Sequence, residues 1–177
     1  MRTAYIAMGG NLASWAGEPE ETLATAALRL ESLGVVTSRS SLYSTAPVGF
    51  AEQPWFVNAV VALATELAPR QLLSGLLAIE QEFGRDRIAG FTNGPRTLDL
   101  DILLLGELEI RENGLEIPHP RLAQRAFVLA PLNEIAPQLL IPGCEKTVAQ
   151  LFAALLESSK NASDAVVQVE SNAWLSR

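Results

Sequence analysis

Apolar residues recur along the chain with two different periods, and these periods predict strands and helices in turn. Where every second residue is apolar or β-branched we expect a strand, and where apolar residues lie three or four apart we expect a helix. In chain order the predicted elements are a strand at 3–8, a helix at 18–33, strands at 35–44 and 56–67, a helix at 69–83, a strand at 98–105 and a short pairing strand at 108–110. Beyond Pro118 the pattern is helical in short pieces, with a last clear helix at 148–156.

Boundary signals support the two long helices. The first has acidic residues in its first turn and Gly34 after its end, and the second opens with Pro69 and closes with Gly84. The order strand, helix, strand, strand, helix, strand over residues 3–105 is the split βαβ arrangement of ferredoxin-like folds. We therefore expect an α+β fold: a ferredoxin-like βαββαβ sandwich with an antiparallel sheet, helices packed on the sheet, and long functional loops.

Length and composition favour one compact domain. The chain has 177 residues, of which 49% are hydrophobic, so it can bury a single core, which we place at residues 1–157. Residues 158–177 are polar at first and then read AVVQVE, which is compatible with an extra edge strand or with a loose tail. The segment 85–97 contains two glycines and a proline without periodicity, and loops of this length are often functional.

The formal charge of −7 argues against nucleic acid or an anionic membrane as a partner, because both reward broad basic surfaces. Apolar stretches fall short of the roughly 18 to 20 residues that a membrane-spanning helix needs. We expect a cytoplasmic monomer without contacts to membrane. The single cysteine, Cys144, can form neither an internal disulfide nor a cysteine cluster for a metal.

The strongest chemical signal is the segment GPRTLDLDILLL at 94–105, where Asp99 and Asp101 interrupt an apolar strand. Alternation puts both carboxylates on one face of the strand, roughly 6 to 7 Å apart. Such a pair needs positive charge nearby, and Mg²⁺ bound by one or two carboxylates, water and phosphate oxygens would supply it. Two ions would form the clamp used for in-line displacement at phosphorus. The spacing alone is equally compatible with ion pairs between both aspartates and neighbouring arginines.

Basic residues gather around the same segment. Six of the thirteen lie between positions 85 and 125, and all six are arginine: Arg85, Arg87, Arg96, Arg111, Arg121 and Arg125. Arginine offers a rigid fork of donors that matches phosphate oxygens, so an acidic protein could still bind a small anionic ligand here. His119 lies between two prolines, and both a structural role and a phosphate contact are open to it. The lack of partner histidines and cysteines argues against a zinc site.

Five ordered blocks of this sequence resemble the 6-hydroxymethyl-7,8-dihydropterin pyrophosphokinase family of folate biosynthesis. The blocks are AYIAMGGNL at 4–12, YSTAPVGFAEQPWFVNAV at 43–60, IEQEFGRDR at 79–87, GPRTLDLDILL at 94–104 and IPHPRLAQRAFVLAPLNEIAP at 117–137. The resemblance implies transfer of the β,γ-diphosphate of ATP to the pterin hydroxymethyl oxygen, with release of AMP. It implies ATP and the reduced pterin as the small-molecule partners, and two Mg²⁺ ions as cofactors.

The resemblance also implies roles for individual residues. Asp99 and Asp101 match the family's magnesium ligands, and Arg85 and Arg96 match the loop arginines that assist transfer. The positions that match the pterin site are Thr45, Pro47, Val48, Phe56, Asn58 and Phe127. The positions that match the surroundings of ATP are Glu80, Arg87, Ile102, His119 and Arg125. The pterin assignments agree with physical expectation, because aromatic faces stack on a flat heterocycle and an amide pairs with its edge.

Two other functions remain open at this point. Paired aspartates on a strand and two metals also serve nucleotidyl transfer, which would release pyrophosphate instead of AMP. A ferredoxin-like sheet can also bind RNA through exposed aromatic residues without catalysis. The acidic charge, and the lack of an aromatic RNA-binding signature in the central strands, argue against the RNA-binding function.

Overall fold

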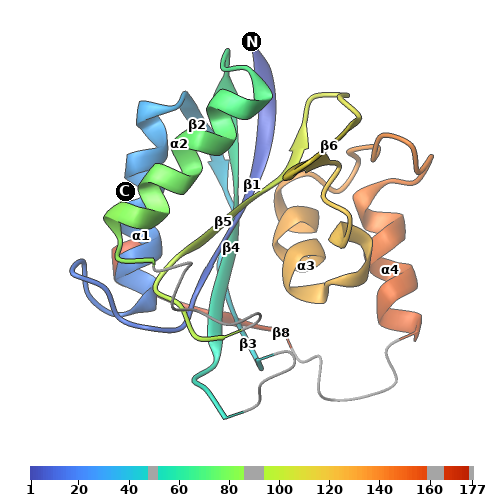
Figure 1. The fold of residues 1–177 in the computed structure, drawn as a ribbon. Coiled ribbons are helices and arrows are strands. Elements are labelled where there is room, and N and C mark those ends of the chain that lie inside the picture. Colours follow the sequence, from blue (N-terminus) through green and yellow to red (C-terminus); the bar gives the residue numbers. More distant parts are fainter. Residues whose placement is uncertain (48–51, 86–93, 159–165, 176–177) are drawn as a thin grey trace.

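The computed structural model describes residues 1–47, 52–85, 94–158 and 166–175, and an antiparallel sheet forms the centre of this part of the chain (Figure 1). The strand order is β5-β1-β4-β3-β8, and β2 also pairs with β4. The strands are β1 (Arg2–Gly10), β2 (Val35–Arg39), β3 (Leu42–Thr45), β4 (Phe56–Thr65), β5 (Asp99–Leu105) and β8 (Val166–Val169). The predicted α+β sandwich with an antiparallel sheet is confirmed.

Helices cover both faces of the sheet (Figure 1). On one face lie α1 (Pro19–Arg29) and α2 (Pro69–Glu82), the two helices that the apolar periodicity predicts. On the other face lie α3 (Ala126–Ile135) and α4 (Val148–Ser158), built from the helical pieces beyond Pro118. A short 3-10 turn precedes α3 at Leu122–Gln124, and another, at Leu30–Ser32, extends α1. Among the described residues, no helix is both long enough and apolar enough to cross a bilayer.

Strands β1, β4 and β5 contribute to two separate cores because alternate side chains point to opposite faces. In β4, Val57, Val61 and Leu63 pack with α1 and α2, whereas Val60 packs with α3 and α4. In β5, Leu100 and Ile102 join the first core. At the N-terminal end of β5 the opposite face carries Asp99 and Asp101, which α3 does not cover.

Two predicted strands differ in the structure. The predicted strand at 35–44 is two strands, β2 and β3, because Ser40 interrupts the ladder: its side-chain Oγ accepts the Val60 N–H at 3.0 Å. The prediction of a pairing strand at 108–110 was wrong. Gly106 takes a positive φ of 55° and the Leu108 N–H bonds the Leu105 carbonyl, so the chain turns there. The next strand, β6 (Ile110–Glu112), pairs instead with β7 (Leu115–Ile117) in a separate hairpin.

The described part of the C-terminal segment is held against the domain. Strand β8 pairs antiparallel with β3 and adds an edge to the sheet, which is one of the two possibilities that the sequence left open. The short helix α5 (Asn172–Leu175) follows and contacts α1. In it, Trp174 is 4% exposed, its indole N–H donates to the Ser40 carbonyl at 2.7 Å, and the Arg39 guanidinium lies 5.0 Å from its ring. This segment therefore contributes to the first core.

Candidate active site

The floor of the site is formed by neighbouring residues of three strands. Gly9 of β1 lies opposite Asp99 of β5 on one side and Asn58 of β4 on the other, and Ala7 lies opposite Asp101. Because Gly9 and Ala7 have almost no side chain, the space above the central strand stays open between the carboxylates and the amide. At Gly9 this space is needed, since a Cβ atom would lie 2.9 Å from Asn58 Oδ1.

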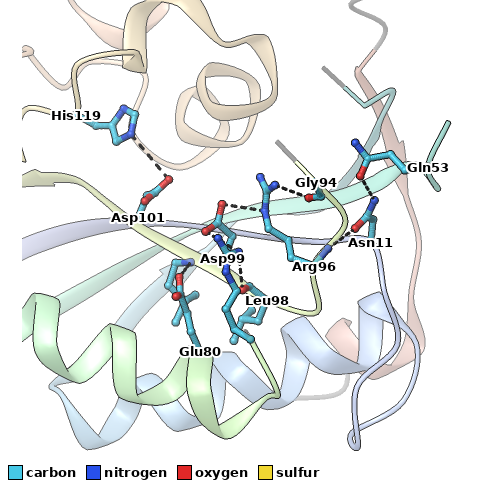
Figure 2. A network of polar contacts seen from close by, with 11 residues as sticks. Asn11, Gln53, Glu80, Gly94, Arg96, Leu98, Asp99, Asp101 and His119 are labelled. Atoms are coloured by element: carbon cyan, nitrogen blue, oxygen red, sulfur yellow. Dashed lines mark hydrogen bonds and ion pairs between the residues drawn. The ribbon is translucent and has the colours of Figure 1, made fainter. Parts of the chain in front are cut away.

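Asp99 forms ion pairs with two arginines (Figure 2). Arg85 Nη1 lies 2.9 Å from Asp99 Oδ1, and Arg96 Nε lies 3.1 Å from Asp99 Oδ2. All three side chains are largely buried, at 16 to 25% exposure. Each arginine also donates to the backbone, Arg85 to Leu98 and Arg96 to Gly94. The ion pairing that the sequence left open is thus present at Asp99 in this structure.

Asp101 is in a different environment. Its side chain is 40% exposed, and His119 Nε2 lies 3.8 Å from its Oδ2 (Figure 2). The two aspartates therefore share one face of β5, as alternation predicts, but Asp101 is the more accessible to a ligand entering from solvent. This difference makes Asp101 the carboxylate that a cation can reach without first displacing the two arginines at Asp99.

His119 is held in one orientation. Its backbone N–H donates to the Leu103 carbonyl at 2.9 Å, and its Nδ1 accepts the Arg121 N–H at 3.1 Å. Burial lowers the pKa of His119 below 6.5, and this outweighs the nearby Asp101 carboxylate, which raises it; Arg125 and Arg121 lower it further. The imidazole is therefore neutral near pH 7, and because Nδ1 accepts a bond, the ring proton lies on Nε2, which faces Asp101.

The start of α3 supplies a cation and an aromatic ring. Arg125 directly precedes the helix, and its guanidinium lies 5.4 Å from the ring of Phe127. Burial lowers the pKa of Arg125, with Arg121 as a further cause, yet the side chain remains charged at neutral pH. Arg125 makes no ion pair with any described residue. It can therefore meet an anionic ligand in the cleft.

A cleft joins these groups. It contains about 430 Å³ of empty space, part of which is open solvent. The predicted site residues that line it are Asn58, Arg96, Asp99, Asp101, His119, Arg125 and Phe127. The structure therefore brings together residues from the predicted metal, pterin and ATP sets, although they come from four separate segments of the chain.

Other predicted pterin residues lie beside the cleft. Asn58 donates to Thr45 Oγ1 at 2.8 Å, and both residues are buried. Phe56 is 8% exposed, and the Arg96 guanidinium covers one face of its ring at 4.7 Å. Pro47 is half-buried just beyond β3. Val48 and Arg87 lie outside the residues that the structure describes.

Two residues assigned to ATP do not reach the cleft with their side chains. Glu80 of α2 is fully buried, and its Oε1 accepts the Leu100 N–H at 2.8 Å from behind β5 (Figure 2). The Ile102 side chain is 5% exposed and packs in the core with α1 and α2. A contact with a ligand in the cleft is therefore open to Ile102 only through its backbone, and Glu80 supports the strand that carries Asp99.

Gly9 and Asn11 are two further residues of the site to which no role could be assigned from the sequence. Gly9 leaves room for Asn58, and Asn11 is a buried side chain that bonds to two other loops. The only signal in the sequence was the run Gly-Gly-Asn after an apolar strand, where small residues allow close approach of other backbone segments.

The comparisons with known proteins agree on one family. The family model described as 7,8-dihydro-6-hydroxymethylpterin-pyrophosphokinase matches residues 5–137. A Pseudomonas aeruginosa protein named 2-amino-4-hydroxy-6-hydroxymethyldihydropteridine pyrophosphokinase is 48% identical over 140 residues, which cover 78% of this chain and 83% of that protein. A Bacillus subtilis protein of the same name is 45% identical over 138 residues, covering 77% and 79%.

Larger proteins contain a similar unit. The mitochondrial folate synthesis bifunctional protein of Arabidopsis thaliana is 46% identical over 132 residues, covering 73% of this chain and 23% of that protein. The solved structure of Plasmodium falciparum HPPK-DHPS with pteroate aligns with a TM-score of 0.72 at 16% identity. That alignment covers 97% of this chain and 47% of the solved chain, so this chain spans about half the length of that protein. At this identity, the likeness concerns the fold alone.

Proposed function

This chain belongs to the 7,8-dihydro-6-hydroxymethylpterin-pyrophosphokinase family, and we propose that the cleft above Asp99 and Asp101 is its active site. It is a pyrophosphokinase of folate biosynthesis, which transfers the β,γ-diphosphate of ATP to the hydroxymethyl group of 6-hydroxymethyl-7,8-dihydropterin and releases AMP. Membership of this family does not favour nucleotidyl transfer or RNA binding. The roles assigned below to single residues are our proposal.

One observation carries the assignment: two carboxylates share a face of β5 and line the same cleft as Arg96, His119 and Arg125. Phosphoryl transfer depends mainly on positioning the reactants and on neutralising charge on the phosphate oxygens. A cleft with two carboxylates at its floor and cationic groups around them is suited to both tasks, since the carboxylates hold divalent cations and the arginines bind phosphate.

The donor set fits Mg²⁺. This ion takes one or two carboxylates and fills its other positions with water and phosphate oxygens, so two aspartates suffice. No group of three or more acidic, histidine or cysteine side chains gathers among the described residues, which also argues against a fully protein-enclosed metal. We propose that Asp99 and Asp101 hold two Mg²⁺ ions, which when bound neutralise the triphosphate and polarise the β-phosphorus.

Arg85 and Arg96 then have two successive partners. In this structure both bind Asp99. With a cation on that carboxylate, both guanidinium groups would become available to the phosphate oxygens of ATP. Arg125 and the Nε2–H of neutral His119 add two further donors on the side of Asp101. This exchange keeps the charge of the site nearly balanced before and after ATP binds.

The pterin is proposed to bind beside the carboxylates. Asn58 has an amide that can pair with the edge of the heterocycle, and Thr45 fixes its orientation through the bond between them. Phe127 lines the cleft at the start of α3, and we assign it to one face of the heterocycle. Phe56, at the start of β4, and Pro47, just beyond β3, are assigned to the same site. Val48 has the same assignment but lies outside the described residues. Aromatic stacking of this kind contributes about 1 kcal/mol beyond the burial of area.

The test is AMP formation from ATP, Mg²⁺ and the reduced pterin alcohol, measured for the wild-type enzyme and for Asp99→Asn and Asp101→Asn. We expect both variants to lose most of the turnover while folding normally. Glu112→Gln is the matched control, because it also removes one carboxylate charge but lies at the surface, paired with Arg70. Retained magnesium-dependent turnover in either aspartate variant would refute the metal assignment, and release of pyrophosphate instead of AMP would refute the reaction.

A further inference from the structure

Asn11 connects three segments of the chain through one buried side chain (Figure 2). It follows directly after β1 and is 4% exposed. Its Nδ2 group donates to Gln53 Oε1 at 3.1 Å and to the Pro54 carbonyl at 2.9 Å. Its Oδ1 accepts the Arg96 N–H at 2.9 Å. Both amide hydrogens and the carbonyl oxygen are thus used, each toward a segment distant in sequence.

The backbone adds to this connection. The N–H groups of Asn11 and Leu12 both donate to the Arg96 carbonyl, at 2.9 and 3.1 Å. The main chain of Arg96 is therefore fixed on both its N–H and its C=O side to the end of β1. The Arg96 side chain can therefore still change its partner, while its backbone keeps one position in the site.

The two segments that Asn11 joins serve opposite sides of the reaction. Residues 94–97 carry Arg96, which meets Asp99 and is assigned to the phosphates. Residues 52–55 lead directly into Phe56 and Asn58 of β4, which are assigned to the pterin. We propose that Asn11 is a positioning residue that sets the distance between the phosphate-binding arginine and the pterin-binding strand end. This proposal rests on the proposed function.

The contacts of Asn11 can be removed separately. Asn11→Ala removes all of the side-chain bonds. Asn11→Asp keeps an oxygen that accepts the Arg96 N–H, but it places a second oxygen against the Pro54 carbonyl, which cannot donate. The aspartate variant therefore loses the bond to the Pro54 carbonyl, which cannot donate, and keeps the link to Arg96, whereas the Gln53 amide can rotate to donate to the new oxygen. Ser14→Ala is the matched control, because Ser14 lies in the same loop and its bonds to described residues all fall within 14–22.

The experiment measures kcat and KM for the pterin and for ATP in these variants, with amide hydrogen exchange at Arg96. Displacement of reacting groups by about 1 Å costs on the order of 100-fold, so we expect Asn11→Ala to lose roughly 10- to 100-fold in kcat/KM for the pterin. We expect Asn11→Asp to raise the pterin KM about tenfold while kcat stays within about threefold. The Arg96 amide should exchange faster in the alanine variant only, and Ser14→Ala should match the wild type.

Three results would overturn the proposal. Asn11→Ala could keep the wild-type kcat/KM while its melting temperature falls, which would show a purely structural role. Asn11→Asp could lose as much kcat as Asn11→Ala, which would contradict the division between the two links. A wild-type enzyme that forms no AMP would defeat the proposed function and this inference with it, whereas an active wild type with unaffected variants defeats the inference alone.

Discussion

Removal of either arginine at Asp99 should strengthen the binding of a divalent cation to the free enzyme while it weakens catalysis. In this structure Arg85 and Arg96 occupy both oxygens of Asp99, so a metal ion would have to compete with them for the carboxylate. Under the proposed function, in contrast, catalysis needs the same guanidinium groups on the phosphates. Arg85→Ala and Arg96→Ala therefore change the two quantities in opposite directions.

The size of the effect follows from the exposure of the pair. The side chains are 16 to 25% exposed, and an ion pair at least partly open to water contributes about 1 kcal/mol. Because 1.4 kcal/mol is tenfold in a binding constant, loss of one competing arginine should tighten cation binding about fivefold. Removal of a positive charge also reduces the repulsion of the cation, so at low ionic strength the fivefold tightening is a lower bound.

The assay is a titration of the enzyme with Mn²⁺ in the absence of ATP, followed by the EPR signal of the free ion and competed with Mg²⁺. Arg29→Ala is the control, because Arg29 also forms an ion pair, with Glu82 at 2.9 Å, but on the surface between α1 and α2. Unchanged or weaker cation binding in both site variants, with a native circular dichroism spectrum, would refute the competition at Asp99.

Three further predictions concern other parts of the molecule. Trp174→Ala should destabilise the protein by about 3 to 5 kcal/mol in urea denaturation, because it removes a buried aromatic side chain and its bond to the Ser40 carbonyl; a change below about 1 kcal/mol would contradict the anchoring of this segment. The pKa of His119 is lowered in the folded protein, so the unfolded chain binds the proton first as the pH falls. The free energy of unfolding of the wild type should therefore decrease from about pH 7 through 6.5, and unfolding curves of His119→Gln should lack this decrease. Gly9→Ala should raise the pterin KM by roughly tenfold with kcat for bound substrate less affected, because the added methyl group displaces the Asn58 amide; an unchanged KM in steady-state kinetics would exclude Asn58 from the pterin site.

Local periodicity was sufficient to predict most of the sheet and both of the helices on its first face. The alternation in 98–105 predicted that Asp99 and Asp101 share a face, and this is observed, because a strand has a fixed period of two residues. The break at Ser40 could not be predicted in this way. It depends on a hydroxyl group that bonds the N–H of a strand distant in sequence.

The burial of Glu80 and the role of Asn11 could not be predicted from the sequence. Glu80 occurs in an amphipathic helix, where a charged residue usually faces water, yet it is fully buried. The reason is tertiary: β5 stands at the end of the strand order, so the Leu100 N–H on its outer side needs a partner, and Glu80 supplies it. The role of Asn11 is equally invisible without the folded chain, because its partners lie at 53, 54 and 96.

The position of β5 between a core and a cleft has a consequence for how this protein can diverge. Leu100 and Ile102 are constrained mainly by the volume that they fill in the core. Substitutions of similar size can therefore accumulate there, together with compensating changes in α1 and α2. Under the proposed function, Asp99 and Asp101 are constrained by the chemistry of their carboxylates, which a change in the neighbouring core cannot replace. Alternate positions of this one short strand are thus under two different constraints. A single percentage of identity averages the two constraints and describes neither.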